Sequence, residues 1–231
     1  MNKTIGITIA RLGIGLLLIK DFIIYFKHRY YLFGEKGILS MESYEATLFA
    51  TDNQFLRLPF ENETFLTYFL LGGIVLSFLF TIGIKPLITS WALLVFITFL
   101  RLRNIYILDG ADNVIWTMLP FMAFAASYQL FTYKKVNTLG FMEKIAPYAM
   151  MIQFSIVYFF AGFSKLIEPI WYEGDAMFYI LRVEDFKPSN LNIWLTNSNF
   201  FVKTSTYFTL AWELTFPILI WFRKLRPLVL G

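Results

Sequence analysis

The stretch TFLTYFLLGGIVLSFLFTIGIK, residues 64–85, determines the class of this protein, because it carries no charged side chain before Lys85. A membrane-spanning helix needs about 20 mostly apolar residues, and this stretch meets that requirement. The whole chain of 231 residues has the same character, since 58% of its residues are hydrophobic and only 16% are charged. A soluble fold could not bury so many Phe, Leu and Ile side chains, because much of its surface faces water. The sequence therefore predicts an integral membrane protein.

The same criterion gives six candidate spans, at 5–26, 64–84, 86–103, 111–132, 145–167 and 205–222. The expected fold is all-α, a multi-pass transmembrane helical bundle that forms one domain over residues 1–231. Two long loops, 27–62 and 168–204, contain aromatic and amphipathic stretches that we expect to lie against the membrane surface. Residues 223–231 have the pattern of a loop followed by the first turn of a seventh helix. We therefore expect the sequence to be truncated at its C-terminus, and the alternative is a short tail that lies at the membrane interface.

The distribution of basic residues predicts the orientation of these spans. Lys and Arg are about three times denser in one set of segments than in the alternate loops, and cytoplasmic segments are the ones enriched in them. The denser segments are 1–4, 82–87, 133–144 and 223–226. The N-terminus is therefore predicted to lie in the cytoplasm.

Residue counts exclude several classes of function. The chain has no cysteine, and His28 is its only histidine, so disulfides, thiolate sites and histidine metal clusters are ruled out. The net charge is +4, and no run of Lys and Arg is longer than two residues, so the footprint of a nucleic-acid-binding protein is missing. We expect the lipid bilayer as the partner of the chain, and neither a bound metal nor a nucleic acid.

Ionisable side chains at membrane depth are costly, and each one suggests a functional site. Arg11 lies well inside the first predicted span, and Glu213 lies at a similar depth in the sixth. We therefore expect Arg11 and Glu213 to form an intramembrane ion pair that ties two helices together.

Lys165 lies near the outer end of the fifth predicted span, on one helix face with Tyr158, Ala161 and Gly162. The two small residues allow a neighbouring helix to approach closely. Partial desolvation there would favour the neutral amine of Lys165, which can act as a base. The alternative is a lysine whose side chain simply extends to the membrane surface.

The predicted outer loop after the third span contains Arg103, Asn104, Asp109 and Asp112. Asp109 and Asp112 stand three residues apart at a predicted helix start, where negative charge is favoured. These two carboxylates either cap the helix or pair with Arg103 or Lys165 to organise a pocket.

The stretch QFSIVYFFAGFSKLIEPIWYEGDAMFYIL, residues 153–181, resembles the signature of the HTTM domain, the membrane domain of vitamin K-dependent gamma-carboxylases and their bacterial relatives. The matching residues are Gln153, Tyr158, Ala161, Gly162, Lys165, Leu166, Trp171, Gly174, Ala176 and Tyr179. Four more stretches agree in the same order, although the third of them lacks the proline of the family motif; they are 10–22, 34–40, 103–115 and 212–231. The resemblance implies a bacterial member of this family in the inner (cytoplasmic) membrane.

The resemblance also implies a chemistry. In the carboxylases a lysine in an AG-x-x-K-L motif is proposed to deprotonate reduced vitamin K, and Lys165 falls on that lysine. A catalytic base near the outer membrane face, acting on a reduced quinone or a lipid-like substrate, is therefore implied for Lys165. Substrate-binding or structural roles around it are implied for Tyr158, Trp171 and Gly174, together with Arg103, Asn104, Asp109 and Asp112.

The departures from the family restrict this expectation. The segment AASYQLFTYKK, residues 125–135, lacks the histidine and the acidic residue that the carboxylases carry there, and their large peptide-gripping domain lies outside this sequence. We therefore do not expect a full peptidyl-glutamate carboxylase. The alternative to an enzyme is a membrane partner in the maturation or export of a secreted peptide, a role found among other members of the family. A transporter is less expected, because no inverted repeat is evident.

Overall fold

The computed structural model describes residues 3–46, 54–136, 140–184, 189–222 and 224–225. Helices dominate these residues, as expected, and the one strand pair described is a two-residue antiparallel ladder of β1 (Ser127–Tyr128) with β2 (Lys135–Val136). The chain forms two compact units, Met1–Met150 and Met151–Gly231.

Three of the six predicted spans correspond to helices that are long and apolar enough to cross a membrane. These are α5 (Glu63–Ile82), α6 (Pro86–Arg103) and α8 (Phe141–Leu166), with mean hydropathies of 2.2, 1.4 and 1.5. Pro86 stands at the start of α6, as its position in the sequence predicted. A proline is tolerated there because the first N–H groups of a helix have no partner within it.

The other three predicted spans also form helices, but each departs from a simple apolar span. The first, α1 (Lys3–Lys27), carries Arg11, Lys20 and Asp21. The fourth, α7 (Gly110–Phe124), has only 15 residues, so it is about 22 Å long, shorter than the ~30 Å hydrocarbon core of a bilayer. The sixth, α12 (Asn199–Leu219), contains Lys203 and Glu213 among many hydroxyl side chains.

The prediction of the fourth span was wrong at its C-terminal end. A helix was expected over 111–132, but α7 ends at Phe124, and the backbone of Ala125 is extended. The following strand β1 offers the Ser127 hydroxyl and the Tyr128 carbonyl to the guanidinium of Arg11, at 2.5 and 2.6 Å. A continued helix would use that carbonyl within its own ladder, so the extended segment supplies the partners that a buried arginine requires.

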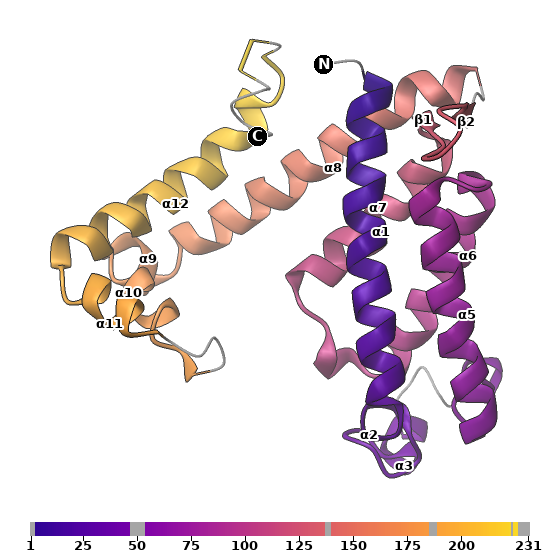
Figure 1. The fold of residues 1–231 in the computed structure, drawn as a ribbon. Helices are drawn as coiled ribbons and strands as arrows, with labels where there is room; N and C mark the ends of the chain where they lie inside the picture. Colours follow the sequence, from indigo (N-terminus) through magenta and orange to yellow (C-terminus); the bar gives the residue numbers. More distant parts are fainter. Residues whose placement is uncertain (1–2, 47–53, 137–139, 185–188, 223, 226–231) are drawn as a thin grey trace. The chain divides into compact units, whose positions relative to one another are not determined.

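Unit 1 is a bundle of long helices in which α1 packs on α5, α5 on α6, α6 on α7, and α7 also contacts α1 (Figure 1). Glycines allow the closest approach: Gly15 of α1 lies against Thr81 of α5, and Gly73 of α5 lies against the ring of Phe22. Small residues at such contacts let helix backbones approach, which is the usual basis of helix packing in membranes. The short helices α2 (Arg29–Phe33), α3 (Met41–Glu45), η1 (Gln54–Arg57) and η2 (Ile105–Ile107) complete the unit.

Arg11 connects three parts of unit 1. Its side chain is only 1% exposed, and its hydrogen bonds reach β1 as described above. The guanidinium also lies against Gly83, the left-handed residue that ends α5 with φ +84°. A Cβ at this position would lie 2.6 Å from Nη1 of Arg11, so the glycine is required both by the backbone conformation and by the space that the arginine occupies.

Unit 2 contains the C-terminal part of α8, the short helices α9 (Pro169–Tyr172), α10 (Ala176–Ile180) and α11 (Asn190–Thr196), and α12. The three short helices all pack on α12. Phe216 of α12 and Ile220, which follows the end of that helix, form a small core with Phe154 and Tyr158 of α8. Helix α12 begins at Asn199, six residues before the predicted span start at 205, because the Ser198 hydroxyl accepts a hydrogen bond from the N–H of Phe201 and caps it.

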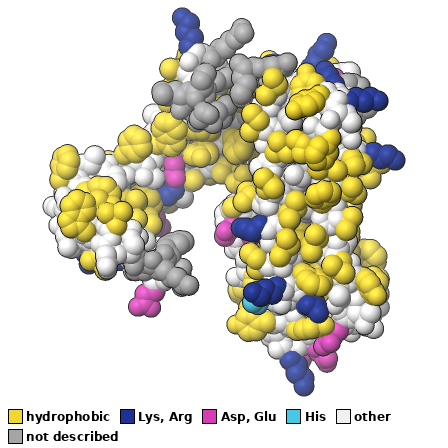
Figure 2. Space-filling model, viewed as in Figure 1, with side chains coloured by type: hydrophobic (Ala, Val, Ile, Leu, Met, Phe, Trp, Pro, Cys, Tyr) yellow, Lys and Arg dark blue, Asp and Glu magenta, His cyan; other side chains and the backbone are white. Residues whose placement is uncertain are grey.

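Large apolar side chains remain exposed along the long helices. Figure 2 shows hydrophobic side chains over much of the visible surface, and Phe160 and Phe163 of α8 and Phe208 of α12 are each more than half exposed. Contiguous apolar surface of this kind is rare on water-soluble monomers. It is what helices that face lipid require.

The contact of Gly73 with Phe22 generates a stability prediction with a control one residue away. A methyl group in Gly73→Ala would overlap the Phe22 ring, whereas the Cβ of Gly72→Ala would meet Phe96 at an ordinary 3.4 Å. We expect Gly73→Ala to destabilise the protein by about 1–3 kcal/mol through overpacking. Gly72→Ala should be neutral or stabilising by up to about 1 kcal/mol. Thermal unfolding of the two variants in detergent measures this, and equal midpoints would contradict the described packing of α1 on α5.

Candidate functional site

An ion pair between Lys165 and Glu213 is the centre of unit 2. Lys165 lies in the last turn of α8, and its Nζ donates to both carboxylate oxygens of Glu213 in α12, at 2.5 and 2.6 Å. The two side chains are 25% and 15% exposed. Charge-assisted hydrogen bonds of this length are among the stronger polar contacts in proteins, and this one joins residues 48 positions apart in the chain.

The surrounding side chains explain why α8 and α12 approach so closely at this point. Gly162, one turn before Lys165, faces α12, where an added Cβ would lie 3.0 Å from Leu214 and 3.2 Å from the Cβ of Glu213. One turn further back, the Tyr158 ring stacks on Phe216 with centroids 4.0 Å apart. The helix face predicted from residues 158, 162 and 165 is thus the face that packs on α12. A larger residue at 162 would push the two charged groups apart.

Two more residues of the signature stretch lie at this site. The ring of Trp171 in α9 lies 5.0 Å from Nζ of Lys165, within the range of a cation–π contact. Gly174 has φ +88°, and a Cβ there would lie 2.9 Å from the hydroxyl of Tyr207 in α12. That hydroxyl donates a hydrogen bond to the carbonyl of Tyr172 at 3.0 Å. The left-handed glycine and the tyrosine therefore hold the segment with Trp171 against α12.

The pairing of Arg11 with Glu213, expected from their depth in the spans, gives way to separate local contacts. Arg11 bonds to Ser127 and Tyr128, and Glu213 bonds to Lys165. Depth was judged from the ends of the predicted spans, but α12 begins earlier than predicted, so Glu213 lies further along its helix than the sequence suggested. The sequence did contain a signal for the pair of Lys165 with Glu213, because Glu213 has the opposite charge and lies on the long helix that follows Lys165. A comparison of depths in the predicted spans does not use this signal.

Arg103 and Asn104 are both fully buried, and they organise the loop that follows α1. Nη2 of Arg103 donates to the carbonyls of Gly34 and Leu39 at 2.9 and 2.8 Å. The Asn104 side chain donates to the carbonyl of Leu32 and accepts from the N–H of Tyr106. These bonds go to backbone groups of unit 1, which gives both residues a structural role there.

The Arg103 guanidinium also lies over the ring of Tyr44 in α3, at 5.1 Å. Burial raises the pKa of the Tyr44 phenol, and the nearby positive charges of Arg103 and Arg57 oppose that rise. The phenol therefore stays neutral at physiological pH, and its ring offers the arginine a π face rather than a negative charge.

Asp109 and Asp112 form a capping box at the start of α7. The Asp109 side chain accepts from the N–H of Asp112, and the Asp112 side chain accepts from the N–H of Asp109, both at 3.0 Å. This is the capping alternative of the two that the spacing left open. Asp112 also lines a cavity between α1, α6 and α7 with Asp21 and Arg101. The cavity holds about 20 Å³, enough for one water and too small for an organic substrate.

The site residues predicted from the sequence thus fall into two groups. One group, around Lys165, gathers on α12 in unit 2 and includes Tyr158, Trp171, Gly174 and Glu213. The other, from Arg103 to Asp112, lies in unit 1 and is used in loop packing and helix capping. Within the described residues, no three His, Asp or Glu side chains come together as metal ligands. The first group thus brings an ammonium, a carboxylate and the ring of Trp171 together.

No protein-family model matches the chain, and neither a curated protein nor a solved structure is significantly similar to it. The resemblance to the HTTM domain therefore rests on the sequence motifs. The function has to be argued from the site itself.

The capping box predicts the cost of losing Asp109. Asp109→Ala removes an N-cap hydrogen bond and the reciprocal contact with Asp112, so we expect it to destabilise the protein by about 1 kcal/mol. Asp175 is the control, because it stands at the N-cap of α10 without any side-chain cap bond. Asp175→Ala should change stability by less than about 0.5 kcal/mol. Denaturant unfolding in detergent compares the two, and an equal loss would contradict the capping role of Asp109.

Proposed function

We propose that this protein is a multi-pass membrane protein of the HTTM type, in which Lys165 acts as a base on the hydroxyl group of a reduced quinone or a similar lipid-like substrate. The observation that carries the proposal is the contact of Lys165 with both oxygens of Glu213, beside the face of Trp171. The three side chains provide a proton donor, a proton acceptor and a flat apolar surface. A quinone ring needs such a surface to stack on.

The proton balance of this pair supports a base. The ammonium of Lys165 and the carboxylate of Glu213 face each other at hydrogen-bonding distance. When a substrate covers the pair and excludes water, transfer of one proton to Glu213 gives two neutral groups, which avoids the cost of desolvated charge. The neutral amine then takes the proton of a quinol hydroxyl and leaves a quinolate beside the new ammonium. One proton moves at each step, and no oxidant is needed for either.

The proposal includes the topology of six spans predicted from the sequence, formed by α1, α5, α6, α7 with the extended segment that follows it, α8 and α12, and a cytoplasmic N-terminus in the inner membrane of a bacterium. The density of basic residues supports this orientation. Lys3, Lys85, Lys134 and Lys144 lie in the segments where Lys and Arg are densest, and such segments are usually cytoplasmic. Lys165, at the other end of α8, would then be near the outer face. A substrate dissolved in the outer leaflet could reach it from the lipid.

Removal of the Lys165 amine tests the chemistry. We expect Lys165→Ala to lower the oxygen-dependent consumption of reduced menaquinone or vitamin K by at least about 100-fold in reconstituted membranes, because dissolved oxygen oxidises the quinolate that the base forms, and a loss of this size is typical for removal of a general base. Lys203→Ala is the matched control, since Lys203 is an exposed lysine on α12. Its activity should equal that of the wild type. Equal rates for Lys165→Ala and the wild type, with both proteins folded, would exclude the quinol chemistry.

The same contact favours a second candidate, a non-enzymatic partner in the maturation or export of a secreted peptide. Each side chain of this ion pair has an opposite charge as its partner. Such a pair is also compatible with a purely structural role, in which it ties α8 to α12. The reversed pair, Lys165→Glu with Glu213→Lys, separates the two functions. It should restore the stability lost in either single variant, because opposite charges still face each other. Restored stability without quinol consumption supports catalysis by Lys165, whereas full complementation in a peptide-export assay supports the partner function.

The topology has its own test. Asn190, exposed at the start of α11, lies in the loop predicted to be outside. Because the chain has no other thiol, Asn190→Cys should react with a membrane-impermeant maleimide in intact cells. Lys134→Cys, in a segment predicted to be cytoplasmic, is the control and should react only after lysis. The opposite pattern would reverse the proposed orientation.

A further inference from the structure

An open cavity of about 450 Å³ lies at one end of unit 1, between the first turns of α1 and α8. Its apolar lining comes from Ile7, Ala126 and Pro147, and its polar lining includes Lys3 and Lys144. A pocket with apolar walls and two cationic side chains fits the boundary between the headgroup and the chains of a lipid.

The charge at this cavity is positive. Its one acidic lining residue, Glu143, is paired with Lys135. Nζ of Lys3 donates to the hydroxyl of Tyr148 at 2.8 Å and lies 4.3 Å from the centroid of the Tyr148 ring. Within the described residues, Lys3 forms no ion pair with an acidic side chain. Lys144 likewise has no ion pair in the described part of the chain.

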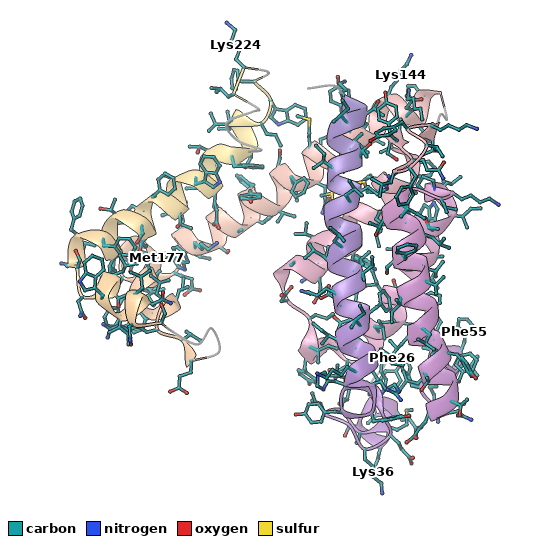
Figure 3. The ribbon with its side chains drawn as sticks, viewed as in Figure 1. Phe26, Lys36, Phe55, Lys144, Met177 and Lys224 are labelled. Atoms are coloured by element: carbon teal, nitrogen blue, oxygen red, sulfur yellow. The ribbon has the colours of Figure 1, made fainter. Side chains whose placement is uncertain are left out.

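The same end of unit 1 carries further basic residues. Lys85 and Lys134 line a neighbouring open cavity of about 340 Å³. Figure 2 shows Lys and Arg side chains at this end of unit 1 and also at the opposite end, and Figure 3 places Lys144 at the end of unit 1 opposite Lys36. A concentration of positive charge attracts anionic lipid over a distance of about one Debye length.

The lengths of α1 and α8 allow this end of the unit to reach headgroup level. Helix α8 has 26 residues and α1 has 25, so they are about 39 and 37 Å long. Both exceed the ~30 Å hydrocarbon core of a bilayer, so a helix of this length that crosses the core leaves at least one of its ends in the headgroup region. Tyr148 is one turn after Lys144, and tyrosines are enriched at this interface.

We propose that this cavity is a binding site for the phosphate of an anionic phospholipid such as phosphatidylglycerol. Lys3 and Lys144 supply the positive charge and hydrogen-bond donors, and the Tyr148 hydroxyl lies beside them. Ile7, Ala126 and Pro147 contact the glycerol and the first methylene groups. The site needs neither Lys165 nor the quinol chemistry, so it holds or fails independently of the proposed function.

Native mass spectrometry of the full chain in detergent tests this site with phosphatidylglycerol and phosphatidylcholine as the probes. We expect one tightly retained phosphatidylglycerol per chain, and no retained phosphatidylcholine. The double variant Lys3→Gln/Lys144→Gln should weaken phosphatidylglycerol binding by roughly tenfold or more, because each lysine contributes to the electrostatic attraction. Lys3→Arg/Lys144→Arg keeps both charges and should bind like the wild type, which excludes misfolding as the cause of the loss.

Lys27→Gln/Lys36→Gln is the matched control, since it removes the same charge at the other end of α1. Its affinity should stay within about twofold of the wild type, because those charges lie beyond a Debye length. Equal binding of the two lipids, or an equal loss in both Gln variants, would overturn the proposal. Displacement of the lipid by glycerol 3-phosphate at equal concentration would also overturn it, since the site would then take a free anion rather than a lipid.

Discussion

A charged side chain in an apolar helix has to find its partner inside the protein, because lipid offers neither hydrogen bonds nor counter-ions. This constraint is met in two ways here. Arg11 is buried among neutral oxygens, the Ser127 hydroxyl and the Tyr128 carbonyl. Lys165 is held by the carboxylate of Glu213. The strand β1 supplies the oxygens that Arg11 requires, and the contact of α8 with α12 brings Glu213 to Lys165. The local architecture at both places is therefore matched to an ionisable side chain.

Glycines make both arrangements possible. Gly83 ends α5 in a left-handed conformation and leaves space for the guanidinium of Arg11. Gly162 lets α12 come close enough for Glu213 to reach Lys165. A side chain at either position would occupy the space of the charged group or push its helices apart. Each charged residue therefore depends on a glycine that makes room for its contact. A small residue one turn before a lysine, as in Gly162 and Lys165, lets the neighbouring helix bring a partner within reach of the amine.

The sequence predicted the positions of the helices better than it predicted which side chains contact each other. Long runs of apolar residues predicted α1, α5, α6 and α8 to within a few residues of their observed bounds. The spacing of Asp109 and Asp112 gave the capping box as one of two alternatives. Hydropathy alone extended α7 beyond Phe124, because it does not register that Arg11 needs an extended segment for its bonds. Arg11 and Glu213, expected to pair with each other, each have other partners within their own units. Depth in a predicted span ignores where a helix actually begins, and which helices are neighbours is a property of the whole fold.

The choice between arginine and lysine distinguishes the structural positions from the candidate catalytic one. Arg11 and Arg103 are the largest fully buried side chains in the described residues, and both donate to neutral acceptors. Arginine keeps its proton under physiological conditions, so its guanidinium is a permanent set of donors and suits a fixed structural role. A lysine, in contrast, is able in general to give up its proton when it is desolvated, which an arginine is not. A purely structural tie between α8 and α12 would be served as well by an arginine, whose planar group matches a carboxylate in two parallel bonds. The presence of a lysine at 165 is therefore an argument for proton transfer that is independent of any family resemblance.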